Sequence, residues 1–427
     1  MHRGSGEQAP PYATSWSADD AIEYIATTCL TPGVPGTVGV ELEWFVHDAR
    51  DPYARVDPAR VTAALPAEGE LAGALSREPG GQVELSSAPA PSLGEAVATA
   101  AADMASLRSG LDAAGLRLSG GGADPYRPPV RVRDAPRYVA MESYFDRAGP
   151  HGRTMMCGTA SVQVCLDAGL PGAGPTGMAR RWRVAHAIGP VLVGAFADSP
   201  CHAGRPTGWK STRQAVWARI DPRRTSPPTG SDPAEAWARY ALDAPVMCVR
   251  GPAPWQVPVG LTLRDWLAGA GPRPVTREDV DYHLTTLFPP VRPRGWIELR
   301  MIDAQHGEDG WLVPLAVATA LVEDPVAADL ALAATERWDP FDPGPWRRAA
   351  AQGLSDRATA DAATACFAAA LDALDRMDAP AAVRTAVERF TDTYVSRGRC
   401  PADDPDRLSH DTPRSEIHDP IRTEAGT

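Results

Sequence analysis

Two glutamates, Glu41 and Glu43, alternate with apolar residues in the segment 38–46. This alternation predicts a β-strand in which both carboxylates point to one face, about 7 Å apart. At an effective dielectric constant of about 20, two such charges repel each other by about 2 kcal/mol. A cation bound between or beside them would turn this repulsion into binding. The alternative interpretation is a half-exposed strand whose two acids face water.

Three further segments, 82–86, 160–167 and 295–303, have the same polarity pattern. If the four strands share a sheet, one face is aliphatic and packs on helices, whereas the other is polar and carries aromatic residues, as a cleft would. On the last strand we place Trp296, Glu298, Arg300 and Ile302 on the polar face. The charged and amide candidates for this face are Glu41, Glu43, Glu84, Gln163, Glu298 and Arg300.

The chemistry of these side chains points to a hard metal ion. Carboxylates without an accompanying cysteine or histidine favour Mg²⁺ or Mn²⁺. Mg²⁺ held by carboxylates normally serves phosphate groups, so nucleotide chemistry is the leading hypothesis. The segment 204–211 approaches a phosphate-binding P-loop but has the wrong spacing and a Trp before its Lys. An acidic sheet face that only meets water stays open as the competing interpretation.

Composition excludes several classes of protein. The net charge of −12 over 427 residues argues against a nucleic-acid partner. The 7 cysteines form no zinc-type spacing. The first ten residues lack the apolar core of a signal peptide, and the longest mostly apolar run, 311–322, is too short to span a bilayer. We therefore expect a cytoplasmic protein with free thiols and no membrane partner.

The rest of the chain is expected to form one catalytic domain over residues 17–400, between a disordered N-terminus (1–16) and a disordered tail (401–427). Ser92 followed by Glu95 predicts the start of a helix that runs to about residue 114. Apolar periodicity predicts further helices. Their ranges are about 61–74, 178–196, 314–337, 355–377 and 380–395.

Several segments together resemble the glutamate–cysteine ligases of the plant and bacterial type, and are most similar to the actinobacterial branch that feeds ergothioneine synthesis. The most specific are Glu-Pro-Gly-Gly-Gln-Val-Glu-Leu-Ser at 78–86 and His-Leu-Thr-Thr-Leu-Phe-Pro at 283–289. The others are 39–43, 155–164, 199–200, 208–217, 240–247 and 298–300. They occur in the family's order and cover about residues 36–325.

The resemblance implies an α+β fold like that of glutamine synthetase and guanido kinases. In that fold a curved, mainly antiparallel sheet holds two or three Mg²⁺ ions (or Mn²⁺) and ATP on its concave face, with helices behind. It also implies the reaction of ATP, L-glutamate and L-cysteine to γ-glutamylcysteine, ADP and phosphate. The expected partners are these small molecules alone, with a monomer expected and a homodimer as the alternative.

By the same resemblance, the expected metal ligands are Glu41, Glu43, Glu78, Glu84 and Glu298. Glu84 and Arg300 are the expected catalytic residues. Substrate or ATP would be bound by Gln163, Lys210, Arg213 and Arg300. Two simpler interpretations stay open: Glu78 as a turn residue and Lys210 as a solvated loop charge. Two other functions also stay open: a related ligase with another amine acceptor, and a non-catalytic metal- or nucleotide-binding homologue.

Overall fold

A computed structural model of the chain describes residues 16–33, 35–172 and 174–408. The expected disorder of residues 1–15 and 409–427 lies outside the described residues. The centre of the molecule is a 7-stranded sheet in which all neighbouring strands are antiparallel. Its order is β2-β3-β1-β5-β9-β8, and β4 pairs with the far end of β1. The strands are β1 (Val38–Asp48), β2 (Ala74–Arg77), β3 (Val83–Ser86), β4 (Leu116–Ser119), β5 (Ser161–Asp167), β8 (Val291–Pro293) and β9 (Trp296–Asp303).

The four strands expected from the sequence are confirmed as β1, β3, β5 and β9, and together with the helices they confirm the α+β class. One residue of β9 is placed wrongly by simple alternation. Ile302 was expected on the polar face, but a bulge between the pairs Val162↔Ile302 and Val164↔Leu299 turns it to the aliphatic face. Ile302 is fully buried there, and the bulge leaves Arg300 on the polar face near Gln163.

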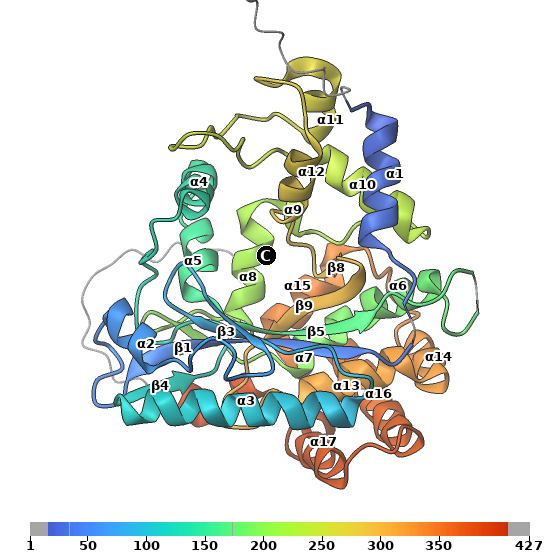
Figure 1. Cartoon of the computed structure of the whole chain (residues 1–427). Coiled ribbons are helices and arrows are strands. Elements are labelled where there is room, and N and C mark those ends of the chain that lie inside the picture. Colours follow the sequence, from blue (N-terminus) through green and yellow to red (C-terminus); the bar gives the residue numbers. More distant parts are fainter. Residues whose placement is uncertain (1–15, 34, 173, 409–427) are drawn as a thin grey trace, which may run out of the picture.

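Helices cover the aliphatic face of the sheet (Figure 1). Three of them, α3 (Leu93–Ala113), α13 (Leu312–Glu323) and α7 (Gly189–Ala195), contact β1, β5 and β9 respectively. Ser92 caps α3 by accepting a hydrogen bond from the Glu95 N–H, as expected. The layer is completed by α6 (Met178–Ala187), α14 (Pro325–Ala334), α15 (Pro343–Gln352), α16 (Arg357–Arg376) and α17 (Ala381–Thr393). The main hydrophobic core lies between this layer and the sheet.

A second group of elements stands over the polar face (Figure 1). It contains α4 (Pro136–Phe145), α5 (His151–Gly158), α8 (Thr212–Ile220), α9 (Pro222–Thr225) and α12 (Arg277–Leu284). Beside them, α1 (Ala18–Cys29), α10 (Pro233–Asp243) and α11 (Leu263–Asp265) enclose a smaller core of their own. Within the described residues, no helix combines the length and apolar character needed to cross a bilayer.

Three expected helices have different limits in the structure. The segment 178–196 divides into α6 and α7 at Gly189-Pro190, since Pro190 has no N–H to continue the first helix. Likewise, Asp324 caps a new helix whose first residue is Pro325, which divides 314–337 into α13 and α14. The segment 61–74 is replaced by α2 (Pro58–Ala64) and, after a turn, the edge strand β2.

The start of the expected disordered tail is also corrected. Residues 401–408 form a 3₁₀ turn (Pro401–Asp403) and a short helix, α18 (Pro405–Leu408). The Ala402 N–H donates to the Ala197 carbonyl at 2.9 Å, and Ala402 is fully buried. Composition predicted disorder here because the segment is rich in Asp and Pro, but this short apolar anchor outweighs that tendency.

The aliphatic face of β1 should be essential for stability. Leu42 is fully buried between β1 and the helices, whereas Leu330 on α14 is 48% exposed. We expect Leu42→Ala to lower the free energy of unfolding by about 2–5 kcal/mol because it leaves a cavity. Leu330→Ala, the matched control, should change it by less than about 0.5 kcal/mol. Urea denaturation followed by circular dichroism measures both, and equal midpoints for the two variants would contradict this packing.

Candidate functional site

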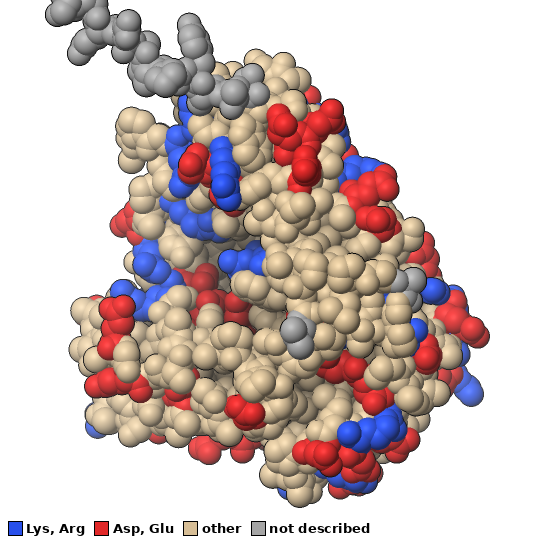
Figure 2. Space-filling model, turned by 45° about the vertical axis from the view of Figure 1, so that its right-hand side comes forward, with Lys and Arg blue, Asp and Glu red and all other residues tan. Residues whose placement is uncertain are grey.

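A cavity of about 260 Å³ lies between the polar face of the sheet and the elements above it. Figure 2 shows acidic side chains inside a hollow and basic side chains around it. The charged and amide groups lining the cavity are Glu41, Glu43, Glu78, Gln82, Glu84, Gln163, Arg137, Arg292, Arg294 and Arg300. Six residues expected from the sequence, Glu41, Glu43, Glu78, Glu84, Gln163 and Arg300, are therefore brought together by the fold.

The register of β1 sets the spacing of the acids on the cavity floor. Glu43 lies opposite Glu84 of β3, and Glu41 lies opposite Gln163 of β5. Paired residues of an antiparallel sheet point to the same face. Strand β1 therefore places Glu41 and Glu43 on the same face as Glu84 and Gln163 of its two neighbouring strands. The Gln163 amide links a carboxylate to a guanidinium group. Its Nε2 donates to Glu43 Oε1 at 2.9 Å, and its Oε1 accepts a hydrogen bond from Arg300.

Glu78 reaches the same cavity from the turn between β2 and β3. The Glu78 N–H donates to the Gln82 carbonyl at 2.8 Å, and the Gly81 N–H donates back to the Glu78 carbonyl at 3.0 Å. Gly81 has φ of +92°, which favours glycine. A Cβ on Gly80 would lie 2.3 Å from the carbonyl oxygen of Cys157, so only glycine lets the turn pack against α5. The two glycines thus fix the carboxylate of Glu78 at the rim.

The acids of the floor lack enough positive charge around them. Burial, and then the charges of Glu298 and Glu84, raise the pKa of Glu41 to about 7. Burial, and then Glu84 and Glu43, raise the pKa of Glu78 to about 8. The pKa values of Glu43 and Glu84 are also raised, first by burial. These side chains therefore fit a bound cation, which would supply the missing charge.

Glu298 differs from the other acids because arginines surround it. Burial alone would raise its pKa, but the charges of Arg292 and Arg300 outweigh burial and hold the pKa at about 2. Arg292 donates to both Glu298 oxygens at 2.6 and 3.2 Å, and Arg300 donates to one of them at 3.0 Å. Glu298 is thus ionised and fully buried. It also orients two arginines at the edge of the cavity.

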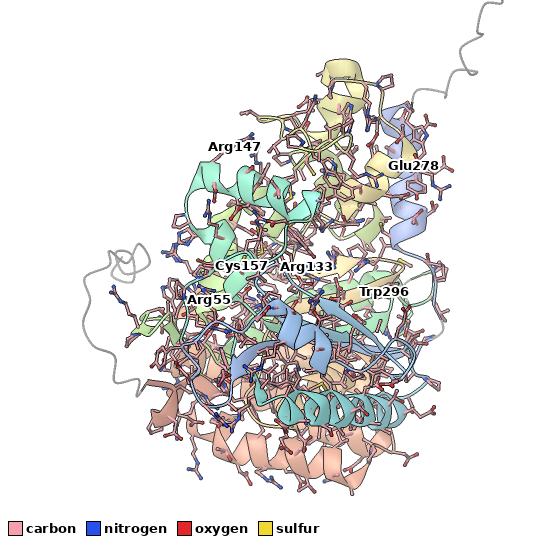
Figure 3. The ribbon with its side chains drawn as sticks, turned by 60° about the vertical axis from the view of Figure 1, so that its left-hand side comes forward. Arg55, Arg133, Arg147, Cys157, Glu278 and Trp296 are labelled. Atoms are coloured by element: carbon pink, nitrogen blue, oxygen red, sulfur yellow. The ribbon has the colours of Figure 1, made fainter. Side chains whose placement is uncertain are left out.

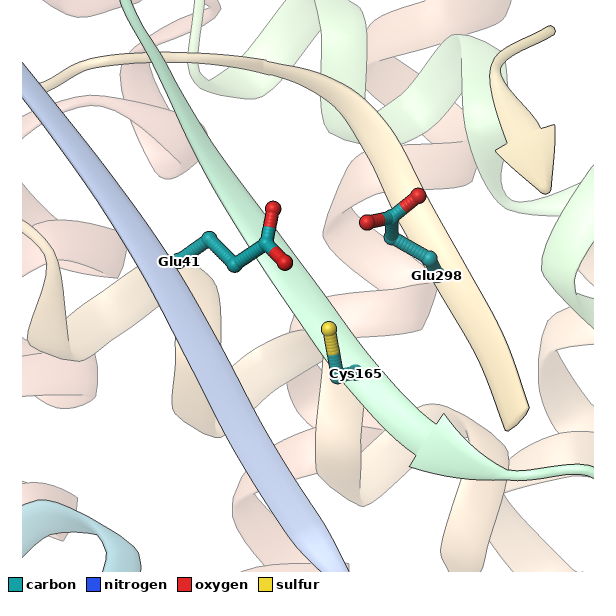
Figure 4. A group of neighbouring side chains, drawn as sticks. All are labelled: Glu41, Cys165 and Glu298. Carbon is teal, nitrogen blue, oxygen red and sulfur yellow. The ribbon is translucent and has the colours of Figure 1, made fainter. Parts of the chain in front are cut away.

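Cys165 joins this part of the site. Glu298 lies opposite Cys165 in the sheet, and ligand atoms of Glu41, Cys165 and Glu298 all lie within 4.8 Å of one another (Figure 4). Burial, followed by the charges of Glu298 and Glu41, raises the pKa of the thiol. The sequence interpretation assumed carboxylates without an accompanying cysteine. That assumption is wrong, because side chains alternate along β5 and Cys165 therefore shares the polar face with Gln163.

Three basic residues of the cavity were not expected from the sequence. Arg292 and Arg294 belong to the β8–β9 hairpin, and Arg292 pairs directly with Glu298 across it. Only Arg294 and Gly295 separate the two strands, and a short connection that contains glycine is a hairpin signal that could have revealed this segment. Arg137 enters from α4, where its guanidinium donates to the side chain and carbonyl of Thr285 at 2.8 and 3.0 Å. No local pattern marks it.

The structure places the other two expected binding residues away from the cavity lining. Lys210 forms an ion pair with Asp403 near the end of the described chain. Arg213 is 2% exposed and lies behind Arg300, to whose carbonyl oxygen it donates at 2.7 Å. Two nitrogens of Arg213, Nε and Nη1, have no hydrogen-bond partner among the described residues. The expected binding roles of both residues stay predictions.

The upper wall of the cavity is apolar. It consists of Met141, Met155, Met156, Trp217 and Phe288, with Tyr138 beside them. On the other side of the Glu78 turn, a separate cavity of about 50 Å³ is lined by Cys157, Arg55, Arg133 and neighbouring residues (Figure 3). The larger cavity therefore combines a charged floor, a basic rim and an apolar wall. This arrangement can hold cations and anionic substrates while limiting access of water.

Comparisons with known proteins agree with this geometry. The family model described as glutamate-cysteine ligase family 2 matches residues 37–423. The glutamate–cysteine ligase EgtA of Mycobacterium tuberculosis H37Rv is 42% identical over 93% of this chain and 91% of that protein. EgtA of Mycolicibacterium smegmatis is 41% identical over 91% of this chain and 90% of that protein.

More distant proteins have the same name or the same fold. The chloroplastic glutamate–cysteine ligase of Medicago truncatula is 33% identical over 54% of this chain and 46% of that protein. The crystal structure of glutamate–cysteine ligase from Francisella tularensis in complex with AMP matches with a TM-score of 0.52 and 12% identity. It covers 87% of this chain and 84% of that one, which shows the fold. The chain belongs to glutamate–cysteine ligase family 2.

Proposed function

We propose that this protein joins the γ-carboxylate of L-glutamate to the amine of L-cysteine at the expense of ATP. The products are γ-glutamylcysteine, ADP and phosphate, and the proposed pathway is ergothioneine synthesis. The observation that carries the proposal is the cavity in which half-buried carboxylates with raised pKa values face a rim of arginines. Membership of the family, and the names of relatives 41–42% identical to this chain, support the choice of substrates.

Mg²⁺ bound at the carboxylates would supply Lewis-acid stabilisation of the ATP phosphates. The ligands we propose are Glu41, Glu43, Glu78, Glu84 and Glu298. The first four line the cavity, whereas Glu298 is fully buried beside it, with a carboxylate oxygen within 4.8 Å of one of Glu41. The raised pKa values of four of them support cation binding, because each ionised carboxylate gains most from a nearby positive charge. We propose that two or three Mg²⁺ ions bind at these carboxylates.

The proposed reaction has two steps. An oxygen of the glutamate γ-carboxylate attacks the γ-phosphorus of ATP, and ADP leaves. The cysteine nitrogen then attacks the acyl carbon, phosphate leaves, and the nitrogen loses a proton as the amide forms. Arg300 is proposed to balance charge on the transferring phosphoryl group, and Gln163 holds Arg300 in place. Glu84 is the proposed acceptor of the released proton.

In the proposed reaction, the apolar wall protects the acyl phosphate from water. An acyl phosphate is lost if water reaches it before the amine does. The cavity is lined opposite the acids by apolar side chains that limit the access of water, namely Met141, Met155, Met156, Trp217 and Phe288.

The proposed partners are the three small molecules alone. A monomeric, cytoplasmic protein belongs to the same proposal, with a homodimer as the alternative.

The amine specificity can be tested by ADP release. With ATP, Mg²⁺ and L-glutamate present, L-cysteine should stimulate ADP release by at least about tenfold over glutamate alone, because the amine discharges the acyl phosphate and allows turnover. L-Serine and L-alanine are matched controls that test the need for the thiol. Equal stimulation by all three would favour the related ligase with another acceptor. No stimulation by any amine would contradict a ligase.

The carboxylate cluster also predicts a pH-dependent effect of Mg²⁺ on stability. The pKa values of Glu41 and Glu78, about 7 and 8, exceed the ordinary value of 4.5. The folded protein therefore keeps protons that the unfolded chain has released, and metal-free stability should fall as pH rises towards about 8. Mg²⁺ should raise the melting temperature more at about pH 8.5 than at about pH 6, because protons no longer compete with it.

Differential scanning fluorimetry in EDTA and in Mg²⁺ measures this effect. Glu78→Gln removes one titrating group, so it should reduce the difference between the two pH values. Glu95→Gln, at the exposed first turn of α3, is the matched control and should leave the difference unchanged. An equal Mg²⁺ shift at both pH values in the unaltered protein would contradict cation binding by these carboxylates.

A further inference from the structure

The end of the described chain packs against the segment that leads into helix α8. Residues 400–407, which we call the C-terminal anchor, contact residues 198–211 through side chains and backbone. One contact is an ion pair between Asp403 of the anchor and Lys210, which directly precedes the N-cap of α8, Ser211. This ion pair therefore joins the anchor to the start of α8.

The path of the Lys210 side chain depends on a glycine. Gly353 has φ of +59°, and a Cβ there would lie 2.7 Å from Cys400 Sγ and 3.4 Å from Lys210 Cγ. A larger residue at this position would displace the sulfur and crowd the lysine. The backbone is fixed as well, because the N–H groups of Lys210 and Ser211 both donate to the Ala350 carbonyl, at 3.1 and 2.9 Å. The ammonium group is thus directed toward the anchor.

The Asp403 carboxylate is oriented to receive this ammonium group. Its Oδ2 accepts a hydrogen bond from the Cys400 N–H at 2.9 Å, which leaves Oδ1 to pair with Lys210. Burial alone would raise the pKa of Asp403, but the hydrogen bonds from Lys210 and Cys400 outweigh burial and lower it below its ordinary value. The Lys210 and Asp403 side chains are only 28% and 21% exposed. Such a pair contributes more than one between freely solvated side chains.

A further contact ties the anchor to Asp198. Arg407 Nε donates to Asp198 Oδ1 at 3.2 Å, and His306 Nδ1 lies 2.7 Å from Asp198 Oδ2. The Asp198 side chain is 1% exposed, so its buried carboxylate depends on these partners. The Asp198 N–H donates to Asp303 Oδ2 at 3.1 Å. This contact therefore extends from the anchor to the end of strand β9.

The segment held by the anchor also supports groups at the cavity. Ser211 Oγ donates to Asp303 Oδ1 at 2.9 Å, which fixes the start of α8 against the end of β9. In the first turn of α8, Arg213 Nη2 donates to the Arg300 carbonyl oxygen at 2.7 Å. Trp217, on the same helix, lines the cavity, and its ring centroid lies 6.0 Å from Arg300 Cζ. A displacement at the start of α8 would therefore reach the arginine that is proposed to contact the phosphoryl group.

We propose that Lys210 is a positioning residue: its ion pair with Asp403 ties the C-terminal anchor to α8 and thereby keeps Arg300 aligned in the cavity. This role differs from the ATP binding that the family resemblance implied for Lys210. The ammonium group faces the anchor, and Lys210 lies outside the cavity lining. The effect on Arg300 rests on the proposed function, whereas the attachment of the anchor does not. The two parts are therefore tested separately.

The attachment can be tested directly because Lys210 is the one lysine of the chain. The purified full chain is treated with an amine-acylating reagent, and modification of the peptide that contains Lys210 is followed over time by mass spectrometry. Asp403→Asn should speed this modification at least about fivefold, because an amine held in an ion pair must open before it reacts. Asp406→Asn, which changes an exposed acid of the anchor, is the matched control and should keep the rate within about twofold. Equal rates for Asp403→Asn and the unaltered protein would overturn the proposal.

ATP provides the contrast with the binding role. Mg²⁺ and ATP together should leave the modification rate of the unaltered protein unchanged, and protection of Lys210 by ATP would overturn the positioning role. If Asp403→Asn does not fold, as judged by circular dichroism, hydrogen–deuterium exchange of Lys210→Met replaces it. The amides of residues 400–407 should then exchange faster than in the unaltered protein. Unchanged exchange would overturn the attachment.

Enzyme kinetics test the effect on Arg300. Lys210→Met should lower kcat for γ-glutamylcysteine formation at least about threefold, since a small displacement of an aligned group slows catalysis. KM for ATP should stay within about twofold, because no contact with ATP is lost. Lys210→Arg should restore at least about half of kcat, because it can form the ion pair with Asp403 again.

A raised KM for ATP with unchanged kcat, or full activity in Lys210→Met, would overturn the positioning role. No turnover in the unaltered protein would contradict the ligase instead. The attachment of the anchor would then still be decided by the modification of Lys210, which requires no substrate.

Discussion

Repulsion among half-buried carboxylates on the polar side of the sheet is the main electrostatic cost of this fold. Glu41, Glu43, Glu78 and Glu84 are crowded into one cavity, where burial and mutual repulsion raise their pKa values. Hydrophobic packing on the other face of the sheet must offset this cost, since isolated strands could not hold the charges together. The proposed Mg²⁺ would relieve this repulsion, and the relief would add to the affinity of the site for the cation.

The position of each charge follows from the backbone. The antiparallel register sets Glu43 against Glu84, the bulge in β9 turns Arg300 toward Gln163, and the glycine turn brings Glu78 to the rim. Arg292, on the neighbouring strand β8, lowers the pKa of Glu298 and so keeps its carboxylate ionised. The resulting site has negative charge on the floor and positive charge at the rim. Substrates that carry phosphate or carboxylate groups would therefore meet the proposed cations on one side and guanidinium groups on the other.

Much of this site could be predicted because alternation along a strand is a local property. The four strands and the shared face of Glu41, Glu43, Glu84 and Gln163 follow from side-chain periodicity alone. Ile302 was misplaced because a bulge depends on the partner strand. Arg137 was missed because helix α4 reaches the cavity only through tertiary packing. Lys210 has Asp403 as its partner, a contact across 193 positions that no sequence window contains.

The most direct test of the proposed chemistry follows the oxygen atoms. L-Glutamate labelled with ¹⁸O in its γ-carboxylate is incubated with the protein, ATP, Mg²⁺ and L-cysteine, and the inorganic phosphate is analysed by mass spectrometry. If a γ-glutamyl phosphate forms, one labelled oxygen per turnover passes into phosphate, because the carboxylate oxygen that attacked the γ-phosphorus leaves with it. Phosphate released together with γ-glutamylcysteine but without the label would contradict the account.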